Sequence, residues 1–420
     1  MRPVRRWLLI FSILISVSPW AEAANLDFHL KTMPNGLKVI YKVIPSNMVT
    51  ANMIVPTGTL NEPRGLRGIS HLLEHLIYRG TENSAASNFR NLLIDDGGTY
   101  NGFTFLERTE YFLTVPSENF PKALSFYLEM LFQPQLDETY IGLEKKIIGV
   151  ENVLRSQPGN AFFLYLNELT EHLLDHGVSS ITREDLVHYH QQFYNPQQMT
   201  LIVTGVFKPE ELFDLLKGIQ SSPPENTFTP VQRLIRDLPK NVTVEDYLNG
   251  EAYQILFGFE LNGLTGKDLT VAKTLPLIFE YESYQYDYLT NRPLDYDISL
   301  FNLTDRFYLV FTYRDCQNQY SLDLNIWHQE NLARFFRYLQ TKNFDNFLHW
   351  LAFKLNNDFQ IIASDPVYLN DYYKNLLFEP SSITTKDLTA IRRLKSKDIS
   401  NFVTKYLKNS GYQKVVIKAL

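Results

Sequence analysis

The sequence predicts an α+β protein of two homologous lobes, each a mostly antiparallel sheet covered by helices. The chain has 420 residues, of which 45% are hydrophobic and 14% aromatic, enough for a large core and for two domains. A polar, proline-rich stretch at residues 221–227 lies near its middle. The order of strands and helices predicted before this stretch recurs after it. We therefore expect lobes at residues 24–220 and 241–420, joined by a linker at 221–240.

The first residues follow a separate pattern. Three arginines among the first six positions precede an apolar run at residues 7–17, and an A-x-A pattern follows at residues 21–23. This predicts a secretory signal peptide over residues 1–23, with a retained membrane anchor as the alternative and a twin-arginine export route left open. The run is too short to span a bilayer, so we expect no stable membrane insertion. The predicted product is exported, to the periplasm in a Gram-negative source, or secreted.

The elements of the first lobe are predicted from turn residues and apolar patterning. An Asn-Gly turn at residues 35–36 opens the first strand, Ser117 is the expected N-cap of one helix, and Asp137 opens another that Pro158-Gly159 ends. The predicted strands are 37–43, 50–55, 99–105, 109–115 and 199–206, and the predicted helices are 65–78, 86–94, 120–132, 137–155 and 209–216.

The second lobe repeats this plan coarsely. Its predicted elements are strands at 242–247 and 253–260, a helix at 268–289, strands at 295–302 and 306–314, several helices between 326 and 407, and a last strand at 413–418. Identity between the two halves is too weak to see, so the duplication depends on element order alone.

Charge and cysteine content exclude two classes of protein. Lys and Arg total 40 against 46 Asp and Glu, a net charge of −6, and no basic run follows the first few residues, which argues against nucleic-acid binding. With one cysteine, Cys316, the chain forms no internal disulfide and no cysteine-based metal cluster. Any metal must be bound by histidines and carboxylates.

The segment His71-Leu72-Leu73-Glu74-His75 has the spacing of a metal site. On a helix the two imidazoles lie about 40° apart and Glu74 lies about 60° to the other side of His71, so all three side chains share one face. Two imidazoles one turn apart can bind one zinc ion, and the carboxylate can reach a water on it. This is the inverted zincin motif. The alternative is a structural histidine pair beside a solvated glutamate.

A catalytic zinc site needs a third protein ligand and an open position. Glu144 and Glu151 are candidates because they are seven residues apart and within about 20° of one another on a later helix. They could equally form a charged solvent face. Spacing alone does not choose between the two glutamates.

The sequence resembles the pitrilysin and insulinase family of zinc metallopeptidases, short two-lobe type, over about residues 27–218. The motifs that carry the resemblance are Gly58–Pro63, Gly68–Leu76, Arg79-Gly80-Thr81, Asn101–Thr104 with Thr109 and Tyr111, the Glu144–Glu151 helix, Tyr194-Asn195-Pro196 and Met199–Gly205.

This resemblance implies a set of roles. Glu151 would be the third zinc ligand with His71 and His75, one Zn²⁺ per chain, and Glu144 would be a catalytic carboxylate that orients the site or the substrate without binding the metal. Glu74 would be the general base that takes a proton from the attacking water.

The resemblance also implies how substrate binds. A peptide would add as a strand to an exposed sheet edge at Asn101, Gly102 and Phe103, where Gly102 replaces the alanine of many relatives. The second lobe has no histidine pair and is expected to be noncatalytic. There Tyr296 matches a substrate-contacting tyrosine, but the arginine expected seven residues earlier is Leu289, with Arg292 nearby.

The expected function is therefore a zinc endopeptidase that cleaves peptides or unfolded segments in an enclosed chamber. Because two lobes make half of the family's four-lobe chamber, we expect a homodimer or a heterodimer with a paralogous subunit. Two alternatives stay open. The chain could be a zinc-containing, peptide-binding or supporting subunit with little activity alone, or a peptidase that matures one dedicated precursor.

Overall fold

The structure is a computed structural model, and it describes most of the two predicted lobes. The described residues are 25–63, 65–81, 97–155, 178–219, 243–248, 254–290, 296–303, 306–313, 344–408 and 411–419, with isolated positions at 162, 165, 166, 169, 170, 333 and 337. The predicted signal peptide, the predicted linker at 221–240, the predicted helix at 86–94, Cys316 and Arg292 lie outside them. The proposed domain boundaries therefore stay predictions.

The first sheet has six strands in the order β1-β2-β6-β3-β5-β4. The strands are β1 (His29–Thr32), β2 (Lys38–Val43), β3 (Met48–Val55), β4 (Thr99–Thr104), β5 (Thr109–Pro116) and β6 (Thr200–Gly205). All neighbours pair antiparallel except β2 and β6, which are parallel. Strand β4 is therefore an edge of this sheet.

The second sheet has five strands in the order β7-β11-β8-β10-β9. The strands are β7 (Thr243–Leu248), β8 (Gln254–Leu261), β9 (Tyr296–Leu303), β10 (Arg306–Tyr313) and β11 (Gln413–Ala419). Here β7 and β11 are parallel and the other pairs are antiparallel.

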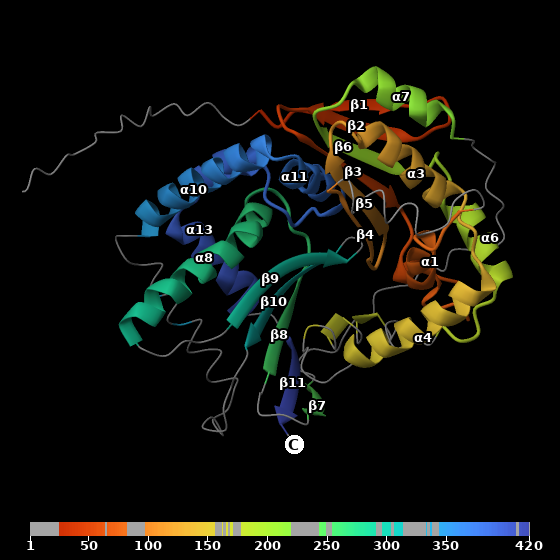
Figure 1. The fold of residues 1–420 in the computed structure, drawn as a ribbon. Helices are drawn as coiled ribbons and strands as arrows, with labels where there is room; N and C mark the ends of the chain where they lie inside the picture. Colours follow the sequence, from red (N-terminus) through yellow and green to blue (C-terminus); the bar gives the residue numbers. More distant parts are fainter. Residues whose placement is uncertain are drawn as a thin grey trace, which may run out of the picture.

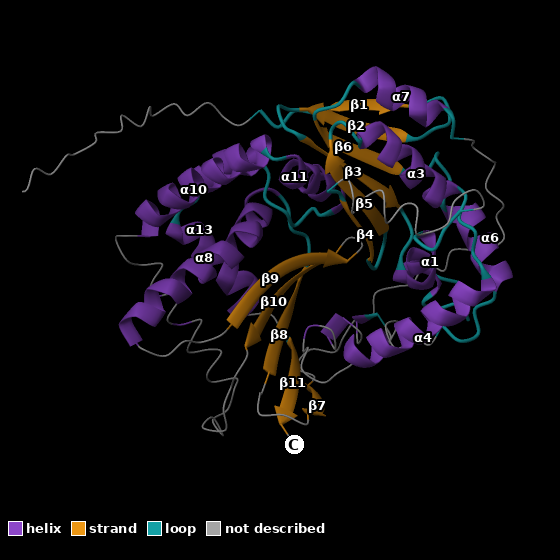
Figure 2. Cartoon of the chain, in the orientation of Figure 1, coloured by secondary structure: helices purple, strands orange, loops and turns teal. Residues whose placement is uncertain are grey.

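The two sheets share one topology. The order β2-β6-β3-β5-β4 of the first corresponds strand by strand to β7-β11-β8-β10-β9 of the second, including the single parallel pair, and β1 is an addition to the first sheet. The predicted α+β fold of two similar lobes with mostly antiparallel sheets is confirmed (Figure 1, Figure 2).

Helices of the first half cover one face of the first sheet (Figure 1). They are α1 (Ile69–Ile77), α3 (Phe120–Phe132), α4 (Glu138–Arg155), α6 (Arg183–Phe193) and α7 (Pro209–Lys217), with a short 3₁₀ turn η1 (Thr59–Asn61). Alternate residues of β3, among them Ala51, Met53 and Val55, are fully buried beneath these helices, as expected because successive side chains of a strand point to opposite faces of the sheet.

Helices of the second half cover one face of the second sheet and also reach the first. They are α8 (Gly266–Thr290), α10 (Phe344–Ser364), α11 (Pro366–Phe378), α12 (Thr385–Arg393) and α13 (Ser396–Val403), followed by a π-helical turn η2 (Thr404–Lys408). None of the helices that the structure describes is long and apolar enough to cross a bilayer.

Each sheet has its second face covered by an element from the other half of the chain. Helix α11 packs on β3 and β6, where the Asn370 amide donates to the carbonyls of Thr50 (3.2 Å) and Ile202 (3.0 Å). In return Tyr165, from the first half, lies buried against the second sheet with Leu256. The two lobes are therefore packed together by reciprocal contacts.

Two local predictions differ from the structure. Helix α1 begins at Ile69 rather than at residue 65 because Gly65 and Gly68 have left-handed φ of 85° and 83°. The N-cap of α3 is Asn119, not Ser117, which contributes only a backbone carbonyl to Phe120.

Helix α6 is not predicted at all. Thr182 caps it by accepting a hydrogen bond from the Asp185 amide (3.1 Å), while the Asp185 carboxylate accepts from the Thr182 amide (2.8 Å). This capping box is visible in the sequence and is the signal that would have found the helix.

Candidate metal centre

Helix α1 places the motif residues against the first sheet. Its apolar side, including Leu72, Leu73 and Leu76, is fully buried. Its start is fixed by Glu62, whose buried carboxylate accepts from the backbone amides of Gly68 (2.7 Å) and Ser70 (3.0 Å). A carboxylate at a helix N-terminus satisfies amides that have no partner within the helix and complements the helix dipole.

His71, His75 and Glu151 converge on one point. The Glu151 carboxylate lies 3.4 Å from His71 Nε2 and 3.7 Å from His75 Nε2, and the three donor atoms lie within 4.8 Å of one another. Two donors on a tetrahedral zinc ion are about 3.4 Å apart, given bonds of about 2.0–2.1 Å. The donor set of two imidazoles and one carboxylate, at these separations, fits a catalytic zinc site.

Glu144 lies behind His75 instead of beside the convergence point. Its carboxylate is fully buried and accepts a hydrogen bond from His75 Nδ1 at 2.7 Å. A proton on Nδ1 leaves the lone pair of Nε2 directed at Glu151 and His71. Arg79 holds the other carboxylate oxygen of Glu144, with Nε at 2.6 Å and a second contact from Nη2. The two glutamates therefore occupy different places, which their spacing in the sequence does not reveal. Glu151 lies at the convergence point, and Glu144 is hydrogen-bonded to the far nitrogen of His75.

Glu74 is buried, with 8% of the residue exposed, between α1 and the edge strand β4. The Thr104 hydroxyl donates to its carboxylate at 2.8 Å. A Cβ on Gly102 would lie 2.7 Å from Glu74 Cγ and 2.8 Å from Oε1, so the space that the missing side chain leaves is occupied by Glu74. Sequence reasoning gives Thr104 no role of its own, although two-residue alternation along the strand places it on the same side as Gly102.

The edge strand has one face toward the helix and one toward solvent. Asn101 and Phe103 are exposed, and Phe103 is 46% exposed, while Gly102 is buried against Glu74. The Tyr78 hydroxyl donates to the Asn101 carbonyl at 2.7 Å. Desolvation, reinforced by Tyr127 and the negative charge of Glu74, raises the pKa of Tyr78 well above its ordinary value, so its hydroxyl remains a donor.

A cavity of about 470 Å³ lies next to the convergence point, between the two lobes. Residues from both halves line it, and they include His71, Thr104, Phe105, Arg108, Phe301 and Glu379. Much of the wall is apolar, which is common in sites that bind organic ligands.

The predicted residues of the second lobe lie wholly or partly outside the described part of the structure. Tyr296 is the first residue of β9, and its backbone pairs with Tyr313 of β10, but its side chain lies outside the described part of the structure. Leu289 lies in the last turn of α8, and its side chain is also outside the described part of the structure. Arg292 lies outside it altogether. The significance of the missing arginine therefore stays a prediction.

The comparison with known proteins identifies the family. A sequence profile described as insulinase, peptidase family M16, matches residues 38–170, and one described as the peptidase M16 inactive domain matches residues 180–345. The chain belongs to peptidase family M16. The two profiles meet between α4 and α6, so the first contains the motif helix and the second begins within the first lobe.

Similar proteins include members of this M16 family from bacteria. The zinc protease PqqE of Helicobacter pylori is 25% identical over 230 residues, which cover 51% of this chain and 52% of that protein. The chain spans about half the length of the curated relatives it matches.

Solved structures share the fold. A protease from Helicobacter pylori superimposes with a TM-score of 0.78 at 18% identity, covering 93% of this chain and 99% of that one. The periplasmic protease PqqL from Escherichia coli gives 0.72 at 15% identity, covering 94% of this chain and 48% of PqqL. A single copy of this M16 chain therefore matches about half of the longer protein.

Proposed function

We propose that the chain is a zinc-dependent endopeptidase that hydrolyses peptides or unfolded segments in an enclosed chamber. One observation carries the proposal: the donor atoms of His71, His75 and Glu151 lie within 4.8 Å of one another, beside a buried Glu74. This is the arrangement that metal-assisted peptide hydrolysis requires, and the M16 membership supports it.

The three donors would bind one Zn²⁺ per chain, which would supply Lewis acidity toward the scissile carbonyl and the attacking water. Glu74 is the general base in this proposal, accepting a proton from that water and passing it to the leaving amine. Thr104 holds the carboxylate toward the strand edge. Glu144 keeps the proton of His75 on Nδ1, and Arg79 balances the buried charge of Glu144.

Strand β4 would bind the substrate by strand addition. It is the last strand of its sheet, and its residue Gly102 lies against Glu74 while Asn101 and Phe103 are exposed. Main-chain hydrogen bonds to such an edge bind an extended peptide with little dependence on its sequence. Folded proteins present few extended segments, so short peptides and unfolded segments are the expected substrates.

The test of the reaction is Glu74→Gln, which keeps shape and removes the base. The zinc-loaded variant should lose at least about a hundredfold in kcat on an unstructured peptide, measured by mass spectrometry of the new termini. Glu138→Gln, at the exposed start of α4, is the matched control and should cleave like the parent. Equal rates for Glu74→Gln and the parent, at equal zinc content, would remove Glu74 from the mechanism.

The metal site has a separate test. We expect His71→Ala to bind far less than one zinc per chain by elemental analysis, because two remaining donors bind zinc weakly. His29→Ala, in the strand at the opposite edge of the sheet, should keep the parental zinc content. Unchanged stoichiometry in His71→Ala would place the metal elsewhere.

A second candidate function is a zinc-containing subunit that binds peptides for a more active partner. Leu289 at the position of the family's arginine favours it, and so does the match of residues 180–345 to a profile described as an inactive domain. It predicts no turnover by the purified chain and turnover after addition of a partner whose own zinc motif is essential. Maturation of one dedicated precursor is a variant of the first function, separable by the range of peptides cleaved.

We further propose that the chain is exported to the periplasm, or secreted, and works as a homodimer or a paired heterodimer. The pattern at residues 1–23 supports export, and so does the shared fold with PqqL, a periplasmic protease. The match to about half of PqqL supports pairing of two such chains into one chamber. N-terminal sequencing of the exported protein should begin at Ala24, and light scattering should give twice the mass of the processed chain.

A further inference from the structure

The turn between β4 and β5, residues 105–108, connects the proposed substrate strand to the rest of the protein. The backbone of η1 is hydrogen-bonded to this turn. The Thr59 amide donates to the Phe105 carbonyl (3.1 Å), and the Leu60 amide donates to the Leu106 carbonyl (2.7 Å). Gly58 is required for this approach, because a Cβ there would lie 2.2 Å from the Phe105 carbonyl oxygen. The turn is thus anchored in its own lobe.

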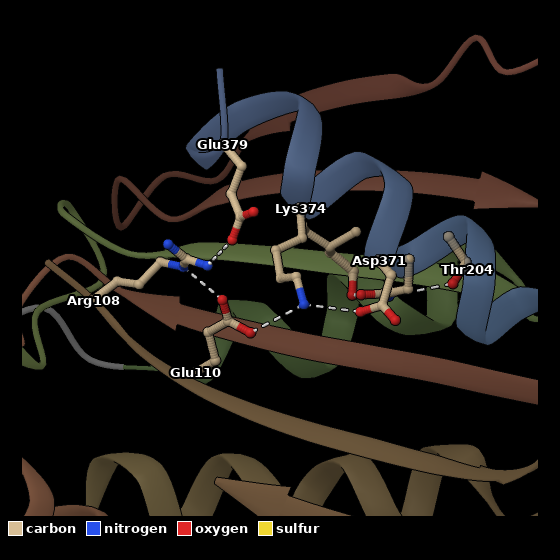
Figure 3. Close-up of polar contacts among 8 residues, drawn as sticks. Arg108, Glu110, Thr204, Asp371, Lys374 and Glu379 are labelled. Atoms are coloured by element: carbon tan, nitrogen blue, oxygen red, sulfur yellow. Dashed lines mark hydrogen bonds and ion pairs between the residues drawn. The ribbon is translucent and has the colours of Figure 1, made fainter. Parts of the chain in front are cut away.

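Arg108 anchors the same turn to the other lobe. Its Nε donates to Glu110 on β5 at 2.6 Å, and its Nη2 donates to Glu379, just after α11, at 2.8 Å (Figure 3). The Arg108 side chain is only 11% exposed and stacks 4.4 Å from the ring centre of Phe105. A planar guanidinium can bind two carboxylates at once from different nitrogens, which a lysine ammonium does less well.

Helix α11 contributes a second contact to the same carboxylate. Lys374 lies 3.4 Å from Glu110 and 2.9 Å from Asp371, so the charges alternate from Glu379 to Asp371 across the boundary between the lobes (Figure 3). Burial alone would lower the pKa of Lys374, but the neighbouring carboxylates reverse this and raise it. Each buried charge therefore has a partner from the other lobe or from its own strand.

These residues also border the cavity beside the metal centre. Arg108 and Glu379 line it together with His71 and Thr104, and Thr104 is the residue that orients Glu74. Only three residues separate Thr104 from Arg108. A shift of the turn would therefore move the strand edge relative to Glu74.

We propose that Arg108 is a positioning residue that couples the second lobe to the substrate strand. By joining Glu379 of one lobe to Glu110 of the other, it fixes the turn and with it the alignment of β4 for an incoming peptide. The inference depends on β4 being the substrate strand, as in the proposed function. It gives the second lobe a part in substrate binding that needs no contact between that lobe and the peptide.

The test compares Arg108→Met with Arg183→Met in the full zinc-loaded chain. Arg183 also makes a side-chain hydrogen bond, to the Leu136 carbonyl at 3.0 Å, but within the first lobe. We expect KM for an unstructured peptide to rise roughly three- to tenfold in Arg108→Met, with kcat within about twofold of the parent, and no change in Arg183→Met. Glu379→Gln should raise KM in the same direction, and the double variant should add little to either single one.

Hydrogen exchange supplies a readout that does not depend on activity. Amides of residues 99–108 should exchange faster in Arg108→Met and in Glu379→Gln, while those of α6 should keep the parental rate. Glu379 is 38% exposed, so its substitution tests the contact even if Arg108→Met does not fold.

Three results would overturn the inference. The first is that amides of residues 99–108 exchange at the parental rate in both variants. The second is an equal acceleration of exchange throughout both lobes, which indicates a general loss of stability. The third is an unchanged KM in both variants. A parent chain that cleaves nothing would count against the proposed function, while the exchange experiment would still decide whether Arg108 couples the lobes.

Discussion

Glu74 has two neighbours that decide where its carboxylate points. Thr104 donates to one oxygen, and Gly102 leaves the room that the side chain occupies. The sequence is sufficient to predict His71, Glu74 and His75, because a helix places residues at these spacings on one face. It is not sufficient to predict Thr104 or Arg79 as partners, because hydrogen bonds between elements depend on their packing. The ligand roles of His71 and His75 and the role of Glu74 as general base stay predictions.

Thr104→Val should lower kcat/KM about tenfold, because it keeps the shape of the side chain and removes a donor to a buried carboxylate, an effect of about 1–3 kcal/mol. Zinc content should change little, because Thr104 contacts Glu74 and none of the three proposed zinc ligands. Thr404→Val is the control, since Thr404 is exposed and its hydroxyl donates to the Ser400 carbonyl within the second lobe. Parental kcat/KM in Thr104→Val would show that Glu74 needs no such support.

The elements that sequence patterning predicts are those with strong local signals. Strands β5 and β10 and helix α3 agree within one or two residues, because apolar runs bounded by turns determine them. Helix α6 is missed because its sequence is polar over most of its length, and only its capping box indicates it. The docking of α11 on the first sheet has no local signal, since it joins residues more than 150 positions apart.

Helix α6 also contributes a pH-dependent contact. His190 Nε2 donates to the Leu131 carbonyl near the end of α3 at 2.7 Å, and desolvation lowers the His190 pKa from about 6.5 to about 4. A histidine that is neutral when folded and protonated when unfolded makes the unfolded state bind more protons at acidic pH. The contribution of the neutral, buried His190 to the free energy of unfolding is therefore fully present above pH 6.5 and decreases as the pH falls toward about 4.

Through His190, the free energy of unfolding should fall by about 3 kcal/mol between neutral pH and about pH 4, because the pKa lies about 2.5 units lower in the folded state. Urea unfolding at several pH values should show a smaller acid-induced loss in His190→Gln, whose amide can still donate but does not titrate. His29→Gln, on an exposed strand, should behave like the parent. Parallel pH profiles for His190→Gln and the parent would contradict this account.

At the scale of the whole molecule, the two lobes are joined by reciprocal packing. Gly258 of β8 lies under Tyr165 from the first half, and a Cβ on it would lie 2.4 Å from the tyrosine Cζ. The duplicated topology is predictable from element order, and the structure confirms it. The reciprocal contacts are not predictable from the sequence, because they join residues far apart along the chain.

Gly258→Ala should therefore destabilise the protein by about 1–3 kcal/mol, since overpacking forces Tyr165 or the strand to move. Gly142→Ala is the control, because a Cβ there meets nothing within 4 Å and alanine favours the exposed helix by about 0.5–1 kcal/mol. The thermal midpoints of the two variants should move in opposite directions. A midpoint for Gly258→Ala equal to or above that of the parent would show that the lobes are not packed at this point.

In the proposed metal centre, three side chains from two helices bind one zinc ion beside Glu74. Anomalous diffraction at the zinc edge, on crystals of the zinc-loaded protein, tests it most directly. We predict a single strong peak about 2.0–2.2 Å from His71 Nε2, His75 Nε2 and a Glu151 carboxylate oxygen. A fully zinc-loaded crystal with no peak there, or with the peak bound by Glu144 in place of Glu151, would contradict the account.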